Sequence, residues 1–236
     1  MNFAVIFAGG VGKRMSGSQI PKQFLEAHGK PIIVHTLEYF QHCDDIDCVI
    51  VCCVAGWLEH MRSLVTQYNL GKVTAIVPGG ETGQLSIYNG LLEAEKRSRA
   101  PAEDIVLIHD GVRPLIDENL LHRNVITVQQ YGSCITCVKV IETIVQSHDQ
   151  SAVDRVYDRD SMLIAKAPQA FRLADILAIH RRALSEGVTN SIDSCTLMSS
   201  YGYPLHMILG DYKNIKITTP IDYAMFKAIL EAEDDE

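Results

Sequence analysis

Cationic side chains gather around a glycine-rich turn near the start of the chain. The segment AGGVGKRM (8–15) follows a short apolar run, and PKQFL (21–25) comes soon after it. Glycine has no Cβ, so the backbone can approach phosphate oxygens closely, and successive N–H groups can form an anion-binding nest. Lys13, Arg14 and Lys22 would then surround a bound triphosphate. The backbone candidates for this contact are Ala8, Gly9, Gly10 and Gly12.

Two familiar phosphate motifs do not fit this turn. A P-loop needs glycine where Phe7 stands, and it needs serine or threonine where Arg14 stands. A dinucleotide fingerprint needs its third glycine where Met15 stands. A solvated basic loop remains the alternative, but Lys22, fixed behind a proline, favours a binding function.

A carboxylate and a guanidinium stand close together in HDGVRP (109–114). They follow an apolar run, so both side chains should lie at the sheet edge where ligands bind. Asp110 can hold Mg²⁺ together with substrate phosphates, or it can orient polyol hydroxyls. Arg113 can contact a phosphate or a ribose, or it can form a purely structural ion pair with Asp110.

Apolar runs alternate with segments of helical spacing along the chain. This alternation predicts an α/β fold with a doubly wound, mostly parallel, Rossmann-like sheet. Ligands bind beyond the carboxyl ends of such strands, which points to the turns 8–22, 78–86 and 109–114. The expected strands are 3–8, 48–54, 73–78 and 104–110, and the segments 206–210 and 214–219 are expected to be strands or strand ends. The expected helices are 31–40, 58–68, 86–98, 173–185 and 221–233.

The second half of the chain has a different pattern. Segments 134–146 and 153–171 read as extended chain with a turn between them. They predict an antiparallel β-arm that projects from the core over about 139–166. No linker or repeat divides the chain, so we expect one domain over 1–236.

Composition narrows the function further. The net charge of −8 argues against a protein that grips nucleic acid with its whole surface. No apolar run approaches the roughly 20 residues of a membrane span, and the N-terminus lacks a secretory signal. The seven cysteines have no framework spacing, and the pair Cys134 and Cys137 lacks the partners of a zinc site. Buried thiols and a cytoplasmic location are expected.

A series of sequence blocks resembles a known enzyme family in both content and order. The family is the nucleotidyltransferase family that contains methylerythritol-phosphate cytidylyltransferase and ribitol-5-phosphate cytidylyltransferase. The resemblance implies that CMP is transferred from CTP to a polyol phosphate and that pyrophosphate is released. It covers nearly the whole chain in the blocks AGGxGxRM, PKQFL, HTL (35–37), GGETGQLS (79–86), HDGVRP, APQAF (167–171) and NIKITTP (214–220).

The resemblance carries the nucleotide contacts to particular positions. Gly79, Gly80 and Ser86 would lie against the cytosine and ribose, and Asp110 would also contact CTP. The alternative for the first three is an ordinary turn in which Ser86 caps the following helix. The acidic and arginine side chains often found inside this block are absent at 83–85, which removes side-chain contacts from the loop.

The resemblance also assigns residues to the acceptor-binding site. Thr143 and Arg159 would bind the sugar phosphate, and the arginine would come from a partner subunit because the arms cross in a homodimer. Lys216 would reach the α-phosphate and the acceptor phosphate. The alternative for Arg159 is an exposed arm residue without a binding role, and the alternative for Lys216 is a solvated surface lysine. Ala167 replaces the usual threonine and so removes a hydroxyl donor from the acceptor pocket.

These residues suggest an in-line attack by the acceptor phosphate on the α-phosphorus of CTP. A phosphate monoester is already ionised near neutral pH, so positive charge and alignment matter more than a general base. Arg14, Lys22 and Lys216 are the catalytic candidates, with Mg²⁺ as the cofactor and Asp110 as its ligand.

The acceptor expected from the resemblance is D-ribitol 5-phosphate, which would give CDP-ribitol for cell-wall or capsule polysaccharide. Trp57 and DSCTLM (193–198) are among the features closer to that branch. 2-C-Methyl-D-erythritol 4-phosphate and other polyol phosphates remain alternatives. A Rossmann-type oxidoreductase would need a third glycine and an acidic ribose ligand that are not evident. A non-catalytic nucleotide-binding protein of the same fold is the other competing class.

Overall fold

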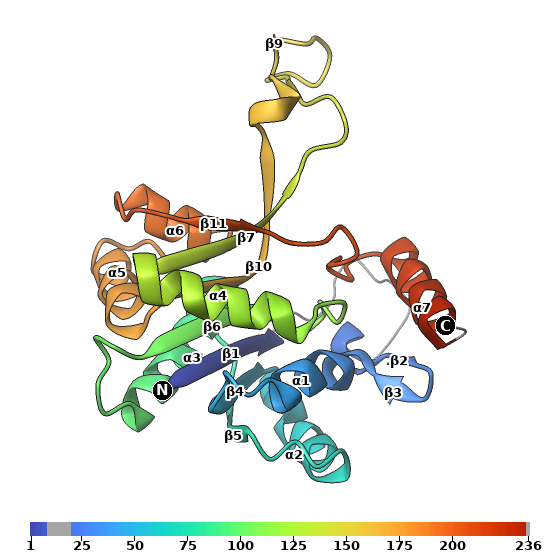
Figure 1. The fold of residues 1–236 in the computed structure, drawn as a ribbon, viewed down its shortest axis with the longest axis vertical. Helices are drawn as coiled ribbons and strands as arrows, with labels where there is room; N and C mark the ends of the chain where they lie inside the picture. Colours follow the sequence, from blue (N-terminus) through green and yellow to red (C-terminus); the bar gives the residue numbers. More distant parts are fainter. Residues whose placement is uncertain (9–19, 235–236) are drawn as a thin grey trace.

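The computed structural model, which describes residues 1–8 and 20–234, is built around a seven-stranded sheet (Figure 1). The strand order is β11-β7-β10-β6-β1-β4-β5. Neighbouring strands are parallel except that β10 runs antiparallel to both β6 and β7. The mostly parallel sheet confirms the predicted fold class. The strands are β1 (Asn2–Ala8), β4 (Cys48–Cys53), β5 (Val73–Pro78), β6 (Ile105–Asp110), β7 (Ser133–Lys139), β10 (Leu163–Arg172) and β11 (Met207–Leu209).

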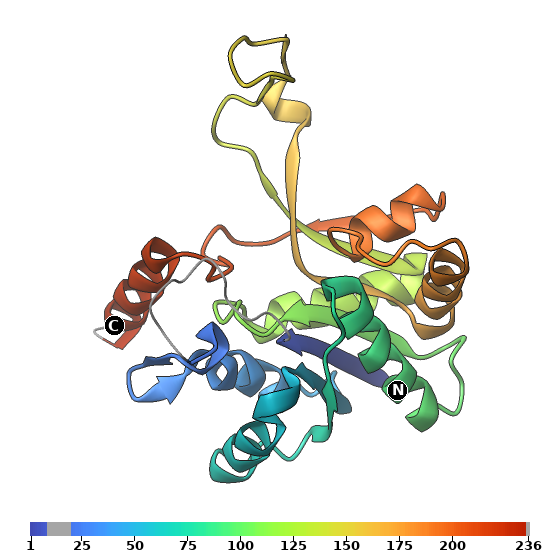
Figure 2. The same ribbon diagram turned by 180° about the vertical axis from the view of Figure 1, so that it is seen from behind.

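Helices cover both faces of the sheet (Figures 1 and 2). Successive side chains of a strand point to opposite faces, so Ala4 and Ile6 of β1 join one core layer while Phe3 and Val5 join the other. The first layer packs against α1 (Ile32–His42), α2 (Leu58–Gln67) and α4 (Glu118–Tyr131). The second packs against α3 (Gly83–Arg97), α5 (Leu173–Ser185) and α6 (Ser194–Ser200).

Local capping sets several helix boundaries. Helix α3 begins at Gly83 rather than at the expected position 86, because the Thr82 side chain accepts a hydrogen bond from the Leu85 N–H at 3.1 Å. Helix α4 was not predicted. It is capped at its start by Asp117 and ends at Gly132, whose φ of 86° is the left-handed conformation typical of a helix C-terminus.

The predicted strand 214–219 is wrong. The segment is extended, and the Ile217 N–H donates to the Val112 carbonyl at 2.9 Å, but no ladder forms along it within the described residues. Its last N–H groups, those of Thr218 and Thr219, bind the Asp222 carboxylate instead. The carboxylate thereby turns the chain into α7 (Pro220–Asp234), whose Phe226 packs in a third apolar cluster with Ile217.

An arm leaves the sheet between β7 and β10, as predicted for about 139–166. Figure 1 shows it projecting well away from the body. Leu163 pairs with Lys139 at its base, and the short strands β8 (Val145–Gln146) and β9 (Arg155–Val156) pair antiparallel near its tip. Its exposed apolar side chains include Ile141, Val145, Val153 and Val156.

The remaining elements are short. They are β2 (Glu26–Ala27), β3 (Lys30–Pro31) and the 3₁₀ turns Lys22–Phe24, Ala55–Trp57 and Arg159–Ser161. Six of the seven cysteines are buried, and burial raises the pKa of the Cys52 thiol to about 12, so these thiols act as small core groups as expected. Within the described part of the chain, no helix is long and apolar enough to cross a membrane.

Candidate active site

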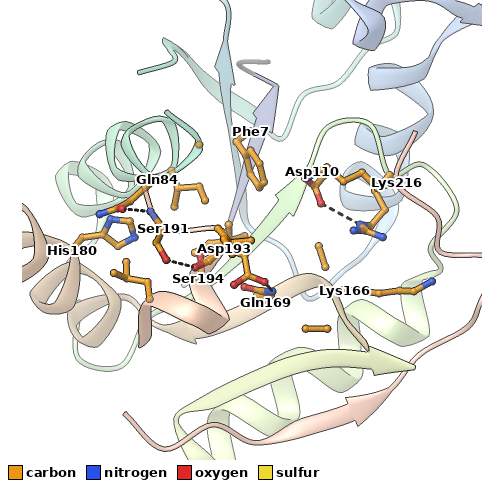
Figure 3. A pocket seen from close by; sticks show the side chains of 18 residues that line it. Phe7, Gln84, Asp110, Lys166, Gln169, His180, Ser191, Asp193, Ser194 and Lys216 are labelled. Carbon is orange, nitrogen blue, oxygen red and sulfur yellow. Dashed lines mark hydrogen bonds and ion pairs between the residues drawn. The ribbon is translucent and has the colours of Figure 1, made fainter. Parts of the chain in front are cut away.

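A cavity of about 170 Å³ opens where β1 and β6 end (Figure 3). Phe7 and Asp110 come from those strands, and Gln84 comes from the first turn of α3. The far wall is formed by β10 around Ala167 and by the start of α6. A shift in strand pairing between Ala165 and Gln169 occurs at this point of β10. The cavity therefore lies at the carboxyl edge of the parallel strands, where the sequence places ligand binding.

Asp110 organises one end of this cavity. One carboxylate oxygen lies 2.5 Å from Lys216 Nζ, and the other lies 3.2 Å from Arg113 Nε. Arg113 Nη1 also donates to the Asn214 carbonyl at 2.9 Å, which ties the turn after β6 to the segment that carries Lys216. The structure thus brings three of the predicted site residues together.

The charges at this end suit an anionic ligand. Burial by itself would raise the pKa of Asp110, but the positive charges of Lys216 and Arg113 outweigh burial and lower it. The carboxylate is therefore ionised, and two cations share it. Lys166, which is not among the predicted site residues, adds a third cation. Its ammonium donates to the Asn214 carbonyl at 3.0 Å, and burial lowers its pKa, with a further contribution from the charge of Arg113.

Lys22 lies next to the same segment. Its ammonium donates to the Ile217 carbonyl at 2.9 Å, directly after Lys216 in the chain. The following residue, Gln23, donates from its side chain to the Ala8 carbonyl at 2.7 Å, so the 3₁₀ turn is joined to the end of β1. The other residues predicted for the glycine-rich turn after β1 lie outside the described residues. They are Gly9, Gly10, Gly12, Lys13 and Arg14.

In the glycine loop after β5, the local structure accounts for two residues, Gly80 and Ser86. The Gly80 N–H donates to Ser86 Oγ at 3.0 Å, and that hydroxyl donates to the Thr82 carbonyl at 2.8 Å. A Cβ on Gly80 would come within 2.5 Å of the Leu85 Cβ. Ser86 therefore does not cap α3, as one interpretation held, but stabilises the loop from inside the helix. Contacts of Gly79, Gly80 and Ser86 with cytosine or ribose stay predictions.

The arm residues do not reach the cavity of their own chain. Thr143 and Arg159 are both exposed, and Arg159 Nη1 lies 3.4 Å from the Ile141 carbonyl within the arm. Neither residue lines the cavity. Their contact with an acceptor held by a partner subunit stays a prediction.

Several residues that line the cavity were not predicted from the sequence. Gln169 Nε2 donates to Asp193 Oδ2 at 2.9 Å, and its Oε1 accepts from the Cys195 N–H at 2.8 Å. His180 and Ser194 also line the cavity. Gln169 and Asp193 lie in APQAF and DSCTLM, but no local pattern indicates that the two segments meet.

The donor set bears on Mg²⁺. Among residues 1–8 and 20–234, no cluster of three or more His, Cys, Asp or Glu side chains could hold a metal ion unaided. Mg²⁺ is commonly held by one or two carboxylates together with substrate phosphates. Asp110 fits that role if phosphate oxygens draw Lys216 and Arg113 away from its carboxylate. The site therefore suits a metal that arrives with a nucleotide.

The fold and the cationic sheet edge define an α/β nucleotidyltransferase. A solved structure described as 4-diphosphocytidyl-2C-methyl-D-erythritol synthase from Anaerococcus prevotii matches with a TM-score of 0.82 and 27% identity. The match covers 98% of this chain and 96% of that one.

The sequence comparisons identify the family. The model of IspD, 2-C-methyl-D-erythritol 4-phosphate cytidylyltransferase, matches residues 2–232. A ribitol-5-phosphate cytidylyltransferase of Streptococcus agalactiae serotype Ia is 53% identical over 100% of this chain and 98% of that protein. One from Vibrio parahaemolyticus serotype O3:K6 is 47% identical with the same coverage. The chain belongs to the IspD cytidylyltransferase family, which confirms the resemblance found in its sequence blocks.

Proposed function

We propose that the protein transfers CMP from CTP to D-ribitol 5-phosphate, giving CDP-ribitol and pyrophosphate. The observation that carries this proposal is full-length similarity to two proteins named ribitol-5-phosphate cytidylyltransferase. The cationic end of the cavity adds physical support, because both substrates are phosphates and would meet Lys216 and Arg113 there.

The reaction needs one bond to form and one to break. A phosphate oxygen of the acceptor attacks the α-phosphorus of CTP, and the bond from that phosphorus to the oxygen bridging to the β-phosphorus breaks. The electron pair leaves with pyrophosphate. The attacking phosphate is already ionised near neutral pH, so the protein has to supply alignment and positive charge.

The described cations can be given roles on this basis. Lys216 would lie between the acceptor phosphate and the α-phosphate, with Asp110 fixing its ammonium at 2.5 Å until substrate arrives. Arg113 would hold the acceptor phosphate, since a guanidinium can donate two parallel hydrogen bonds to it. Lys22 would contribute charge from the β1 side, because its ammonium already lies beside Ile217.

Mg²⁺ would be held by Asp110 and the triphosphate, and it would neutralise the charge of the pyrophosphate that leaves. Since Asp110 is the one carboxylate that the described residues place at this end, metal affinity should depend on the nucleotide. Isothermal titration should show Mg²⁺ binding in the presence of CTP and little without it. Chelation with EDTA should abolish turnover, and excess Mg²⁺ should restore it.

A homodimer would complete the acceptor site. The arm exposes apolar side chains such as Val153 and Val156, each with 60% of its surface accessible. Their burial against a second chain would carry Arg159 and Thr143 to the partner's cavity. Sedimentation of the purified protein should give twice the chain mass, and deletion of the arm tip should reduce it to one.

The test is pyrophosphate release from CTP with a panel of acceptors. D-Ribitol 5-phosphate should give the highest kcat/KM, and mass spectrometry should detect CDP-ribitol. 2-C-Methyl-D-erythritol 4-phosphate, the acceptor in the family description, is the main competitor, and ATP, GTP and UTP replace CTP as nucleotide controls. The Lys216→Ala protein, purified in parallel, controls for contaminating activity. A higher kcat/KM with methylerythritol phosphate would overturn the proposed acceptor.

A further inference from the structure

The cavity has two chemically different ends. Figure 3 shows Asp110 and Lys216 toward one end and Gln84 and His180 toward the other. The second, inner end is lined by α3, α5 and the start of α6, and its polar side chains carry no formal positive charge. A ligand that spans both ends meets cations at one end, and hydrogen-bonding groups without positive charge at the other.

Several polar groups of the inner end are already engaged in holding the wall. Gln84 donates to the Val188 carbonyl at 2.7 Å and accepts from the Ser191 N–H at 2.7 Å. Asp193 accepts from Gln169 at 2.9 Å and from the Thr196 N–H at 2.7 Å. These bonds fix the segment that leads into α6.

His180 and Ser194 are different. Their exposed fractions are 1% and 3%. Within the described part of the chain, neither ring nitrogen of His180 has a hydrogen-bond partner, and neither does Ser194 Oγ. Buried polar atoms are nearly always paired in native proteins, and what distinguishes His180 and Ser194 from other unpaired buried groups is that both line the cavity, where a bound ligand can supply the partner.

Both side chains are held in place for such a ligand. The His180 ring stacks on Tyr88, with ring centres 5.7 Å apart and planes 8° from parallel. Ser194 is the first residue of α6, directly after the capping residue Asp193. The two groups are therefore positioned by packing and capping rather than by their own polar atoms.

The chemistry of the groups identifies the part of the ligand that they bind. Burial lowers the pKa of His180 to about 4, so the imidazole is neutral near pH 7, with one donor nitrogen and one acceptor nitrogen. A serine hydroxyl likewise donates and accepts. Hydroxyl groups match this pattern, whereas a phosphate would require donors alone.

We infer that His180 and Ser194 determine acceptor specificity by hydrogen-bonding the hydroxyls of the polyol phosphate that lie farthest from its phosphate. The inference rests on the proposed function. Arg113, Ala167, His180 and Ser194 line one cavity. An acceptor with its phosphate beside Arg113 would therefore extend its polyol chain past Ala167 to the inner end.

The test compares two acceptors that differ in one group, D-ribitol 5-phosphate and 1-deoxy-D-ribitol 5-phosphate, which lacks the terminal hydroxyl. His180→Phe keeps a ring for stacking on Tyr88 but removes both nitrogens. His180→Gln restores a donor and an acceptor, and Ser194→Ala removes only the hydroxyl. Ser185→Ala is the matched control, because the Ser185 hydroxyl donates to the Arg182 carbonyl on the exposed side of α5.

His180→Phe and Ser194→Ala should each raise the KM for D-ribitol 5-phosphate about 10-fold, the effect of one lost hydrogen bond. The KM for CTP should stay within about twofold. The preference of the wild type for ribitol phosphate over its deoxy analogue should fall in at least one of these variants, and His180→Gln should recover part of the affinity. Ser185→Ala should behave as the wild type.

The outcomes separate this inference from the proposed function. If the wild type turns over D-ribitol 5-phosphate but both variants keep its KM and its preference between the acceptors, the inference is wrong and the function stands. If the wild type gives no product with D-ribitol 5-phosphate, the proposed function and the inference both fail.

Discussion

The two ends of the cavity differ in how their buried polar side chains are compensated. At the cationic end, Asp110 contacts both Lys216 and Arg113, so the charges compensate one another before any ligand binds. At the inner end, His180 and Ser194 keep unpaired polar atoms, within the described part of the chain. An uncompensated buried charge is far more costly than an unpaired neutral group. The charges of Asp110, Lys216 and Arg113 are therefore held as ion pairs, while the neutral side chains of His180 and Ser194 can remain unpaired until a ligand binds.

The comparison predicts that catalysis resides at the cationic end. Lys216→Ala and Lys22→Ala should each lower kcat about 10²-fold or more, because each removes positive charge from the transition state. Steady-state kinetics with CTP and ribitol phosphate measure the effect. Inner-end variants should instead change the acceptor KM, and the contrast in kcat separates the two ends.

Lys213→Ala supplies the control for the lysine variants. Lys213 belongs to the same segment, but its ammonium lies 3.3 Å from Glu233 and does not line the cavity. Its kcat should match the wild type. Near-normal kcat in both Lys22→Ala and Lys216→Ala would show that the proposed mechanism is wrong.

The cationic end should be incomplete in a single chain. Arg159→Ala should raise the acceptor KM by roughly 10-fold, since a hydrogen bond from a charged group to phosphate is lost. Mixing subunits gives a sharper result. A dimer of one Arg159→Ala chain and one Lys216→Ala chain has one site with both side chains intact if the arms are exchanged.

Measured with the acceptor well below its KM, where loss of Arg159 lowers the rate, such mixed dimers should recover about half of the wild-type kcat/KM, because one of two sites is complete. They can be isolated by tagging the two chains differently and purifying in tandem. If Arg159 served the cavity of its own chain, each site would carry one defect. A kcat/KM for the acceptor no higher than the mean of the two homodimers would therefore exclude arm exchange.

The pH dependence of folding stability should differ between the two ends of the cavity. The lowered pKa of His180, about 4, means that the unfolded chain binds more protons than the folded one below the ordinary value of 6.5. Stability is therefore lost as pH falls from about 6.5 toward 4. His180→Phe should remove a loss of roughly 2 kcal/mol between pH 7 and pH 5, measured by urea unfolding.

The contribution of a second buried histidine, His109, cancels when the wild type is compared with His180→Phe. Its pKa is also lowered to about 4 by burial, so it contributes a similar loss in both proteins and cancels in the comparison. Asp110 behaves in the opposite direction, since its lowered pKa keeps it charged until the pH falls below the ordinary value of 3.8. Parallel stability curves for the wild type and His180→Phe from pH 7 to 5 would contradict the buried neutral imidazole.

Sequence patterns predicted the frame of the site well. The apolar run 104–110 and the turn after it placed Asp110 and Arg113 at the sheet edge, and the structure joins them at 3.2 Å. The extended segments around 139–166 predicted the arm. These features depend on neighbouring residues, because strand alternation and turn chemistry act over a few positions.

The same patterns failed where a segment's partner lay elsewhere. The run 214–219 reads as a strand, but Asp222 captures its last N–H groups and prevents a ladder. Helix α4 has caps at both ends, at Asp117 and Gly132, that the apolar pattern alone did not reveal.

The sequence by itself determined the alternating fold, the arm, the family and the carboxylate–guanidinium turn. The tertiary structure decided which distant side chains meet: Arg113 reaches the Asn214 carbonyl across 101 positions, and Gln169 reaches Asp193 across 24. It also placed His180 and Ser194 in one cavity. Local preferences fix the shape of each element, but only the burial of whole faces against one another fixes which elements become neighbours.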